Sequence, residues 1–227
     1  MTTSAHFWPQ GTVYGCLLNS RTELAALGDQ VLQPPYKGTP RAPVLYVKTA
    51  NTWARSGEPL LLPSLIEQVE VGAAVALVMG APEPSRAKGK AQPSVAGYVL
   101  VNDLSLPHAS FFRPPVKFKC LDGFFGVGPV CVPAGQAGDP ARFIMEVRIN
   151  EILRQTVLFS DFVRNAEALL ADVSAFMTLR CGDLLLLGCG ASRPLAAPGE
   201  RIDIRLRDRP DFGILNTRLV RAPQEAV

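Results

Sequence analysis

The sequence predicts an α+β protein that is rich in β-strand. Two observations support this fold class: many short apolar segments read as strands, and only one long segment has helical periodicity. Strands and helices do not alternate as in a parallel βαβ series, so we expect much antiparallel pairing. No repeat or clear linker interrupts the 227 residues. The sequence therefore predicts one domain over residues 1–227, with residues 1–10 frayed.

The expected strands span residues 12–18, 44–48, 70–79, 98–101, 128–132, 143–149, 184–187, 202–206 and 214–220. In residues 143–149 every second side chain is large and apolar, which is typical of a half-exposed strand. A short helix is expected at residues 21–27, where Gly28 ends it. A long helix is expected at residues 161–177, capped by Ser160, because its apolar residues recur at helical spacing. Residues 81–93 read as a solvated loop rich in Pro and Lys.

Composition argues against several classes of function. Hydrophobic residues make up 48% of the chain, which is enough for a sizeable core, and the net charge is only +3 with scattered basic residues, so nucleic acid is not an expected partner. No apolar segment reaches the roughly 18 residues of a membrane-spanning helix. The N-terminus does not resemble a signal peptide. The five cysteines form no CxxC pair, so we expect a cytoplasmic chain with reduced thiols.

Residues 97–124 carry the most informative chemistry. An apolar strand ends at Asn102-Asp103, and a buried carboxylate there needs a hydrogen bond, a charge partner or a cation. Lys117 and Lys119 follow in strand-like alternation, and Asp122-Gly123 reads as a turn. Asp103 and Lys119 together suit a divalent cation beside an anionic substrate. The same residues also fit a turn cap and a surface lysine, so the pattern alone indicates an α+β domain able to bind a small anion.

No standard catalytic motif is present. The sequence contains no GxSxG, HExxH, P-loop or GxGxxG pattern. His6 lies in the N-terminal segment and His108 in a loop, and neither has a companion at metal-ligand spacing. Both histidines are therefore expected to be structural or to lie on the surface.

Five segments in order along the chain resemble the fumarylacetoacetate hydrolase family. They are GTVYGCLLN, VLYVKTANT, VAGYVLVNDLSLPH, FKCLDGF and FMTLRCGDLLLLGCG. Within that family they are most similar to the N-terminal half of two-part isomerase/decarboxylases of aromatic catabolism. The resemblance implies a β-rich roll of mixed sheets. It also implies a site for Mg²⁺ or a similar divalent cation, held by a Glu-x-Glu strand and an aspartate, since hard cations prefer oxygen ligands.

Carried over by position, the resemblance places Asp103 as the metal-ligating aspartate and Lys119 as the substrate lysine, both with catalytic roles. Lys48 and Asn51 lie in the segment beside the site, and Cys189 takes the place of a substrate-binding residue in Gly188-Cys189-Gly190. A lysine at such a site neutralises a substrate carboxylate or a developing oxyanion.

The chain departs from the family pattern at several of these positions. Gly72 and Ala74 stand where the two glutamates are expected, so the metal site is incomplete. Glu23 lies near the place of a water-activating histidine, and Pro107 replaces an arginine. These gaps match the N-terminal half of the two-part enzymes, although they also put independent metal-dependent catalysis in question.

The expected function is that of a subunit of such an isomerase/decarboxylase, acting on a dicarboxylate or tricarboxylate. Its expected partner is a paralogous C-terminal-type subunit or a second copy of this chain. The loss of both glutamates leaves open a non-catalytic structural partner of a metal-binding paralogue. An acylpyruvate hydrolase or hydratase of the same family is a third alternative, which the absence of the histidine disfavours.

Overall fold

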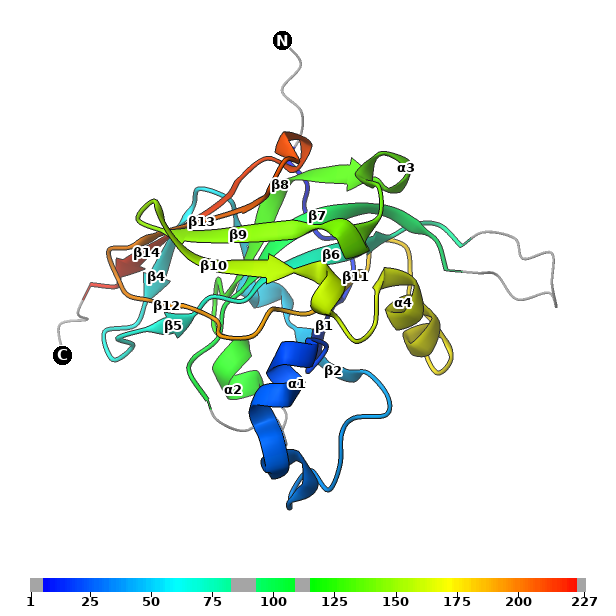
Figure 1. Cartoon of the computed structure of the whole chain (residues 1–227). Helices are drawn as coiled ribbons and strands as arrows, with labels where there is room; N and C mark the ends of the chain where they lie inside the picture. The colour runs from blue at the N-terminus through cyan, green and yellow to red at the C-terminus, as the bar shows by residue number, and fades with distance from the viewer. Residues whose placement is uncertain (1–5, 83–92, 109–114, 224–227) are drawn as a thin grey trace, which may run out of the picture.

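The computed structural model describes residues 6–82, 93–108 and 115–223 (Figure 1). Its strands are β1 (Val13–Leu17), β2 (Val44–Lys48), β3 (Trp53–Arg55), β4 (Pro59–Leu62), β5 (Val69–Glu70), β6 (Ala73–Met79), β7 (Val95–Asp103), β8 (Phe125–Pro133), β9 (Ile144–Ile149), β10 (Ile152–Leu158), β11 (Leu184–Leu186), β12 (Leu195–Ala196), β13 (Arg201–Leu206) and β14 (Leu215–Arg221). Residues 1–5, where fraying is expected, and most of the predicted loop at 81–93 lie outside the described residues.

The helices among the described residues are short. They are the α-helices α1 (Arg21–Leu27), α2 (Val116–Lys119), α3 (Ala134–Ala137) and α4 (Ala166–Ser174), and the 3₁₀ turns η1 (Gly28–Leu32), η2 (Ala50–Thr52), η3 (Pro140–Arg142), η4 (Phe159–Asp161) and η5 (Pro210–Phe212). In this part of the chain, none is long and apolar enough to cross a membrane. The predicted α+β, strand-rich class is confirmed.

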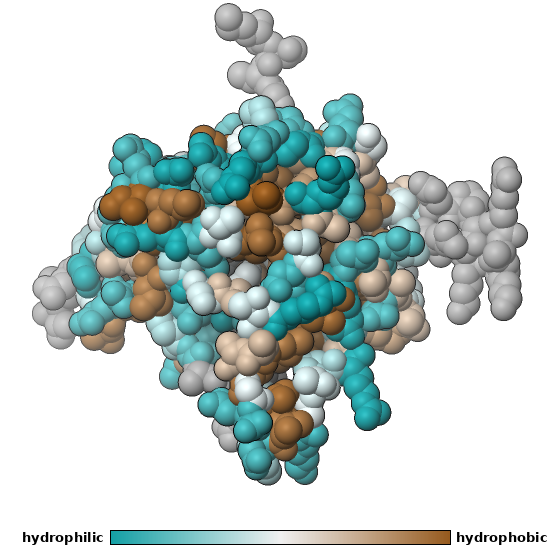
Figure 2. Space-filling model, viewed as in Figure 1, coloured by the Kyte–Doolittle hydropathy of each residue, from teal (hydrophilic) through white to brown (hydrophobic). Residues whose placement is uncertain are grey.

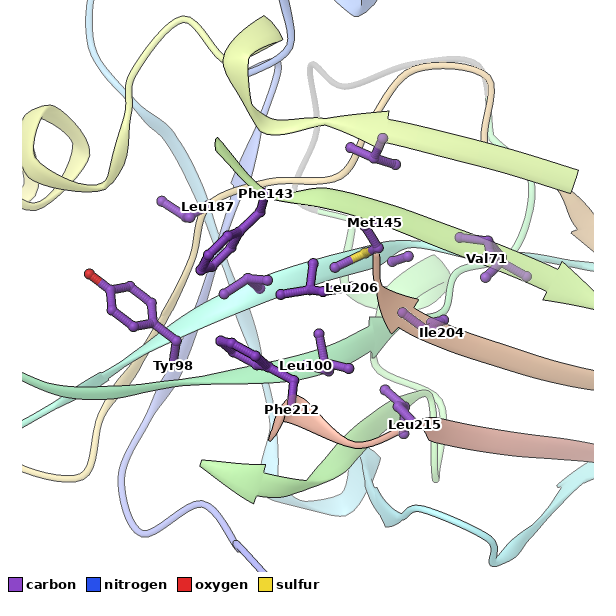
Figure 3. Packing of buried hydrophobic residues seen from close by; sticks show 14 of the residues in the cluster. Val71, Tyr98, Leu100, Phe143, Met145, Leu187, Ile204, Leu206, Phe212 and Leu215 are labelled. Atoms are coloured by element: carbon purple, nitrogen blue, oxygen red, sulfur yellow. The ribbon is translucent and has the colours of Figure 1, made fainter. Parts of the chain in front are cut away.

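Two mixed sheets form most of the fold. The larger has the strand order β2-β1-β11-β6-β7-β8-β3, and the smaller has the order β10-β9-β13-β14-β4. The two sheets pack face to face, as Figure 3 shows for Tyr98 and Leu100 on one side and Met145, Ile204 and Leu206 on the other. A two-stranded pair, β12-β5, lies beside them.

The central strand β6 is buried along its whole length. Val75, Leu77 and Met79 belong to the cluster between the sheets, whereas Ala74 and Ala76 belong to a second cluster on the opposite face. Burial on both faces explains why this segment reads as a continuous apolar run rather than as alternation. The single strand predicted for residues 70–79 is divided into β5 and β6. β5 pairs with β12 in the two-stranded sheet, β6 lies in the larger sheet, and the chain crosses between the two sheets at Gly72.

The predicted long helix at residues 161–177 is wrong. Only α4 is α-helical, and its cap is Asn165, whose side chain accepts a hydrogen bond from the Ala168 amide at 2.9 Å. The preceding residues are extended: Phe162 forms a bridge with Ser20, and the Val163 amide donates to the Asn19 carbonyl at 2.7 Å. Pairing with the end of β1 therefore overrides the local helical pattern.

The larger sheet must curl, because it brings together side chains from distant strands. Three strands separate β2 from β7, which in a flat sheet would keep them about 19 Å apart at about 4.8 Å per step. Yet Lys48 of β2 and Asp103 of β7 form an ion pair at 2.9 Å. The curl thus creates the place where the predicted site residues meet.

Candidate functional site

Asp103 lies at the end of β7 and is fully enclosed. Its Oδ2 accepts hydrogen bonds from Lys119 Nζ, at 2.6 Å, and from the Tyr46 hydroxyl. Its Oδ1 lies 2.9 Å from Lys48 Nζ in an ion pair. Each carboxylate oxygen therefore faces an ammonium group. We call Asp103, Lys48, Lys119 and Tyr46 the lysine cluster.

Lys48 ends β2 and is buried to its tip, which is rare for a lysine. Besides the ion pair, its Nζ donates hydrogen bonds to the backbone carbonyls of Leu104, at 2.9 Å, and Lys119. The ion pair with Asp103 adds charge attraction without a hydrogen bond, because Asp103 Oδ1 has no hydrogen-bond partner. Lys48 thus joins the ends of β2, β7 and α2.

Lys119 lies on α2 and not on a strand, so the strand predicted from the alternation of Lys117 and Lys119 is wrong. The Lys119 amide donates to the Pro115 carbonyl at 2.8 Å, which closes a helical turn. A stretch of four residues is too short for periodicity to distinguish the two structures. The turn separates the two lysines: Lys117 is exposed, and Lys119 is buried against Asp103 with its Nζ 4.7 Å from the centre of the Tyr46 ring.

The lysine cluster has a defined charge state. Burial by itself would raise the pKa of Asp103, but Lys119 and Lys48 outweigh it and hold that pKa well below its usual range. Burial lowers the pKa of Lys48, against the opposing effect of Asp103. Burial and the nearby Asp103 charge raise the pKa of Tyr46, which keeps its hydroxyl protonated as a donor. Asp103 is therefore the anion on which the cluster is built.

A second charged group lies next to the first. Arg193, from the loop after β11, is 3.5 Å from Glu23 of α1 and 3.4 Å from Glu70 of β5. Ser105 Oγ donates to Glu70 at 3.3 Å. The three charged side chains are only 12%, 13% and 18% exposed. Burial raises the pKa of Glu23, although the positive charges of Arg193 and Lys119 oppose the rise.

The other predicted site residues lie at different depths. Cys189 is buried beside Gly72, and burial raises the pKa of its thiol to about 12, so the thiol is protonated. Asn51 is exposed, and its amide donates to the Cys120 carbonyl at 3.1 Å and to Asp122 at 2.6 Å. Asn51 therefore ties the loop after β2 to the predicted turn at Asp122-Gly123. Its role in substrate binding stays a prediction.

The divalent cation implied by the resemblance does not fit these residues. Both oxygens of Asp103 already face ammonium groups. A Cβ added at Gly72 would overlap with the Asp103 carbonyl oxygen, so the backbone excludes a glutamate there. Ala74 is buried in the apolar cluster of the larger sheet. Among the described residues, no group of three or more His, Cys, Asp or Glu side chains could hold a metal ion.

Sequence reasoning missed two residues of this region. Tyr46 lies two positions before Lys48, and this spacing places both side chains on the same face of β2, so strand periodicity could have found it. The Tyr46 ring lies over Gly15 of β1, where any Cβ would overlap with it. Arg193 lies in an irregular loop, and no periodic signal marks it. The two histidines, which were expected to be structural or to lie on the surface, are not part of the lysine cluster. The His108 ring stacks on the Phe118 ring with their centres 4.8 Å apart, and His6 is exposed.

Comparison with known proteins finds relatives of this chain. The family model described as "Fumarylacetoacetate (FAA) hydrolase C-terminal" matches residues 12–220. The 4-hydroxyphenylacetate degradation bifunctional isomerase/decarboxylase of Salmonella dublin is 38% identical over 201 residues, covering 88% of this chain and 46% of that protein. The protein of the same name from Escherichia coli is 36% identical over 195 residues, covering 86% and 44%. The chain thus spans about half the length of these curated relatives.

Solved structures share the fold. The fumarylpyruvate hydrolase from Pseudomonas aeruginosa in complex with Mn²⁺ and pyruvate superposes with a TM-score of 0.71 at 20% identity, covering 98% of this chain and 94% of that one. Enzymes of the family generally depend on a divalent metal, so the absence of a set of metal ligands among the described residues is a departure from the common pattern. On the match over residues 12–220 and these identities, the chain belongs to the fumarylacetoacetate hydrolase family.

Proposed function

We propose that this chain is the N-terminal-type subunit of a bifunctional isomerase/decarboxylase of 4-hydroxyphenylacetate catabolism. The assembled enzyme would decarboxylate 5-oxopent-3-ene-1,2,5-tricarboxylate and isomerise 2-hydroxyhepta-2,4-dienedioate. The relatives at 38% and 36% identity carry that activity in their names, and this chain aligns with about half of each. In this proposal the missing half is supplied by a paralogous C-terminal-type subunit that retains the metal ligands.

The observation that carries the proposal is the lysine cluster. Lys48 and Lys119 place positive charge on both oxygens of Asp103, where the family pattern calls for a divalent cation. A fixed ammonium can hold an anionic substrate by charge, but it has no open coordination position with which to polarise a keto acid. The proposal therefore assigns the metal-dependent chemistry to the partner and anion binding to this chain.

A non-catalytic structural role in the same assembly is the second candidate. It is favoured by the contacts of Lys48, whose Nζ donates hydrogen bonds to two backbone carbonyls and forms an ion pair with Asp103, all within the chain itself. In that case the cluster only secures the ends of β2, β7 and α2. The two candidates differ in whether Lys119 affects turnover of the assembled enzyme.

The test is the ultraviolet decay of the conjugated tricarboxylate with the purified chain, with a Glu-x-Glu paralogue, and with both, each saturated with Mg²⁺. We expect no turnover by this chain alone and restored turnover in the mixture. Lys119→Ala in the mixture should lower kcat/KM if the chain binds substrate, whereas unchanged kinetics would support the structural role. Turnover by this chain alone, lost in Lys119→Ala, would contradict the division of labour proposed here.

A further inference from the structure

The outward side of the smaller sheet carries a concentration of positive charge. Seven charged residues form this surface, which we call the arginine face: Arg148, Arg201, Arg205, Arg207, Arg218, Glu146 and Asp203. Five positive and two negative charges leave it with +3, which equals the formal net charge of the whole chain. We propose that the arginine face binds an acidic surface of a partner protein. The identity of that partner as the paralogous subunit rests on the proposed function, whereas its acidic chemistry does not.

Strand periodicity places these side chains on one side of the sheet. Every second residue of β13 belongs to the cluster between the two sheets, so the residues in between point outward. The register extends this side across neighbouring strands: Asp203 lies opposite Arg148 of β9, and Arg201 lies opposite Arg218 of β14. Figure 2 shows hydrophilic and hydrophobic side chains next to each other over β9 and β10. The arginine face is thus a continuous surface built on three paired strands.

Three arginines converge on Glu146, whose side chain is only 8% exposed. Arg205 donates two hydrogen bonds to Glu146 Oε2, at 3.1 and 2.8 Å, and Arg207 donates one to Oε1 at 3.0 Å. Arg148 lies 3.6 Å from the same carboxylate. The hydrogen bonds from Arg205 and Arg207 hold the pKa of Glu146 below its usual range, so the carboxylate is ionised. One carboxylate therefore offsets one of three guanidinium groups, and this group of four keeps a charge of +2.

Two of the arginines have nitrogens that can reach a partner. The described contacts of Arg207 use only its Nε, and its side chain is 43% exposed. Arg218 is exposed and has no ion pair or side-chain hydrogen bond with the described residues. It faces Arg201, whose guanidinium is already paired with Asp203 at 2.9 Å. Since like charges directly opposite each other destabilise a sheet, a carboxylate from a partner would relieve this repulsion.

Exposed leucines flank the arginine face at both edges of the sheet. Leu61 of β4 is 56% exposed at one edge, and Leu153 and Leu158 of β10 are 44% and 49% exposed at the other. The five strands span about 19 Å at about 4.8 Å per step, which is too wide for one small anion. Apolar contacts at both edges, with arginine between them, are typical of protein interfaces. The two acidic residues within the face would repel the phosphates of a nucleic acid.

A second copy of this chain is not the expected occupant. In a two-fold dimer the same patch faces itself, so the arginine face would meet an identical surface with a charge of +3. Such like-charge contacts select against a partner, whereas an acidic surface on a different chain complements the face and speeds association. Of the two partners expected from the sequence, the paralogous subunit therefore fits this surface and a homodimer does not.

The experiment is a fluorescence anisotropy titration of dye-labelled poly-L-glutamate with the full chain. Arg218→Glu should raise Kd at least about tenfold in about 0.05 M salt, because it reverses a charge that has no partner among the described residues. The difference should disappear near 1 M salt, where the Debye length falls to about 3 Å. Arg180→Glu is the matched control: it makes the same change in charge at an exposed residue before β11, and should bind within about twofold of the unaltered chain.

Thermal unfolding separates docking from a structural role. Arg218→Glu places opposite charges at the two facing positions of β13 and β14, so its unfolding midpoint should equal or exceed that of the unaltered chain while its affinity falls. Arg218→Gln removes the charge without reversing it and should raise Kd about threefold. This milder variant tests the proposal even if the reversed charge disturbs the sheet.

Three results would overturn the proposal. The first is binding of polyglutamate by Arg218→Glu and Arg218→Gln that equals binding by Arg180→Glu. The second is tighter binding of duplex DNA than of polyglutamate, with that affinity lost in Arg218→Glu. The third is a homodimer, seen by analytical ultracentrifugation, that Arg218→Glu dissociates, because a second copy would then occupy the face.

Failure of this inference is distinguishable from failure of the proposed function. In the mixture with a Glu-x-Glu paralogue, Arg218→Glu should raise the paralogue concentration needed for half-maximal turnover at least about tenfold, with the turnover at saturation unchanged. Unchanged polyglutamate binding in Arg218→Glu removes the docking surface and leaves the subunit assignment intact. Absence of turnover in the mixture removes the subunit assignment and leaves the polyglutamate result, and hence the acidic partner, intact.

Discussion

Asp103, Lys48 and Lys119 place three charges where water has almost no access. Removing each ion from water costs several kcal/mol, and mutual attraction repays this only with good geometry and full hydrogen bonding. Here each Asp103 oxygen lies beside an ammonium and Lys48 also donates to two backbone carbonyls, but Asp103 Oδ1 accepts no hydrogen bond, so the hydrogen bonding is incomplete. Since apolar residues often replace buried ion pairs without loss of stability, stability alone does not account for these residues.

Lys119→Met tests the energetics of the lysine cluster. The substitution leaves Asp103 buried with one ammonium fewer, so we expect the free energy of unfolding to fall by about 3–5 kcal/mol. Lys117→Met, two residues earlier on the same helical turn but exposed, should change it by less than about 0.5 kcal/mol. Urea denaturation followed by circular dichroism measures both. Equal, small losses in the two variants would contradict the buried ion pairs.

The pH dependence of stability follows from the lowered pKa of Asp103. Because the pKa of Asp103 is lower in the folded protein than the 3.8 of an unperturbed carboxyl, its ionised form stabilises the fold above that value. This contribution is lost as the pH falls further towards the folded pKa. The difference in unfolding free energy between the unaltered chain and Asp103→Asn should thus be constant from pH 7 to about 5 and narrow below about 4. A pH-independent difference would contradict this assignment.

At the scale of elements, the sequence predicted correctly the helices and strands whose bounds are specified by local residue patterns. The helix at residues 21–27 and the strand at residues 44–48 have the predicted bounds, since a glycine stop and a short β-branched run define them. The helix at residues 161–177 was too long, because Asn19 and Ser20 hold residues 162–163 extended from a distant part of the chain. Periodicity carries no information on such pairings.

In the candidate site, too, local patterns predicted some residues, whereas contacts between distant segments could not be predicted. Asp103 and Lys119 were predicted to hold a divalent cation and an anionic substrate side by side, and in the structure they lie together but form an ion pair with each other at 2.6 Å. Lys48 and Cys189 also lie here, but the resemblance, not their spacing, singled them out. Arg193 was missed because it joins Glu23 and Glu70 across segments far apart in sequence. The curl of the larger sheet, which no local signal specifies, assembles these groups.

Gly72→Ala tests the crossing between β5 and β6. The new Cβ would overlap with the Asp103 carbonyl oxygen, so we expect a loss of about 1–3 kcal/mol in the free energy of unfolding. Gly135→Ala is the matched control: it lies in α3 with open space around its Cβ position, and should stabilise the protein by up to about 1 kcal/mol. If Gly72→Ala were as stable as the unaltered chain, the backbone would also have room for a glutamate, and the argument against the metal would fail.

At the scale of the whole molecule, the chain keeps the family's fold, but its described residues provide no set of ligands for the family's divalent cation. It aligns with about half of each bifunctional relative, 46% of one and 44% of another, and two similar halves can divide a function between them. Under the proposed function the other half carries out the metal-dependent chemistry, whereas this half has the buried lysine cluster around Asp103. In that proposal, the incomplete metal site and the need for a partner both follow from the missing glutamates.

Titration of the purified chain with Mn²⁺, followed by electron paramagnetic resonance of the free ion, tests the central claim most directly. The account predicts no saturable binding up to millimolar Mn²⁺, because both Asp103 oxygens face ammonium groups and the described residues provide no further ligand set. Addition of EDTA should likewise leave the thermal unfolding midpoint unchanged. One equivalent of tightly bound Mn²⁺ that is lost in Asp103→Asn would contradict the account, since Asp103 would then be a metal ligand and the chain a metalloenzyme in its own right.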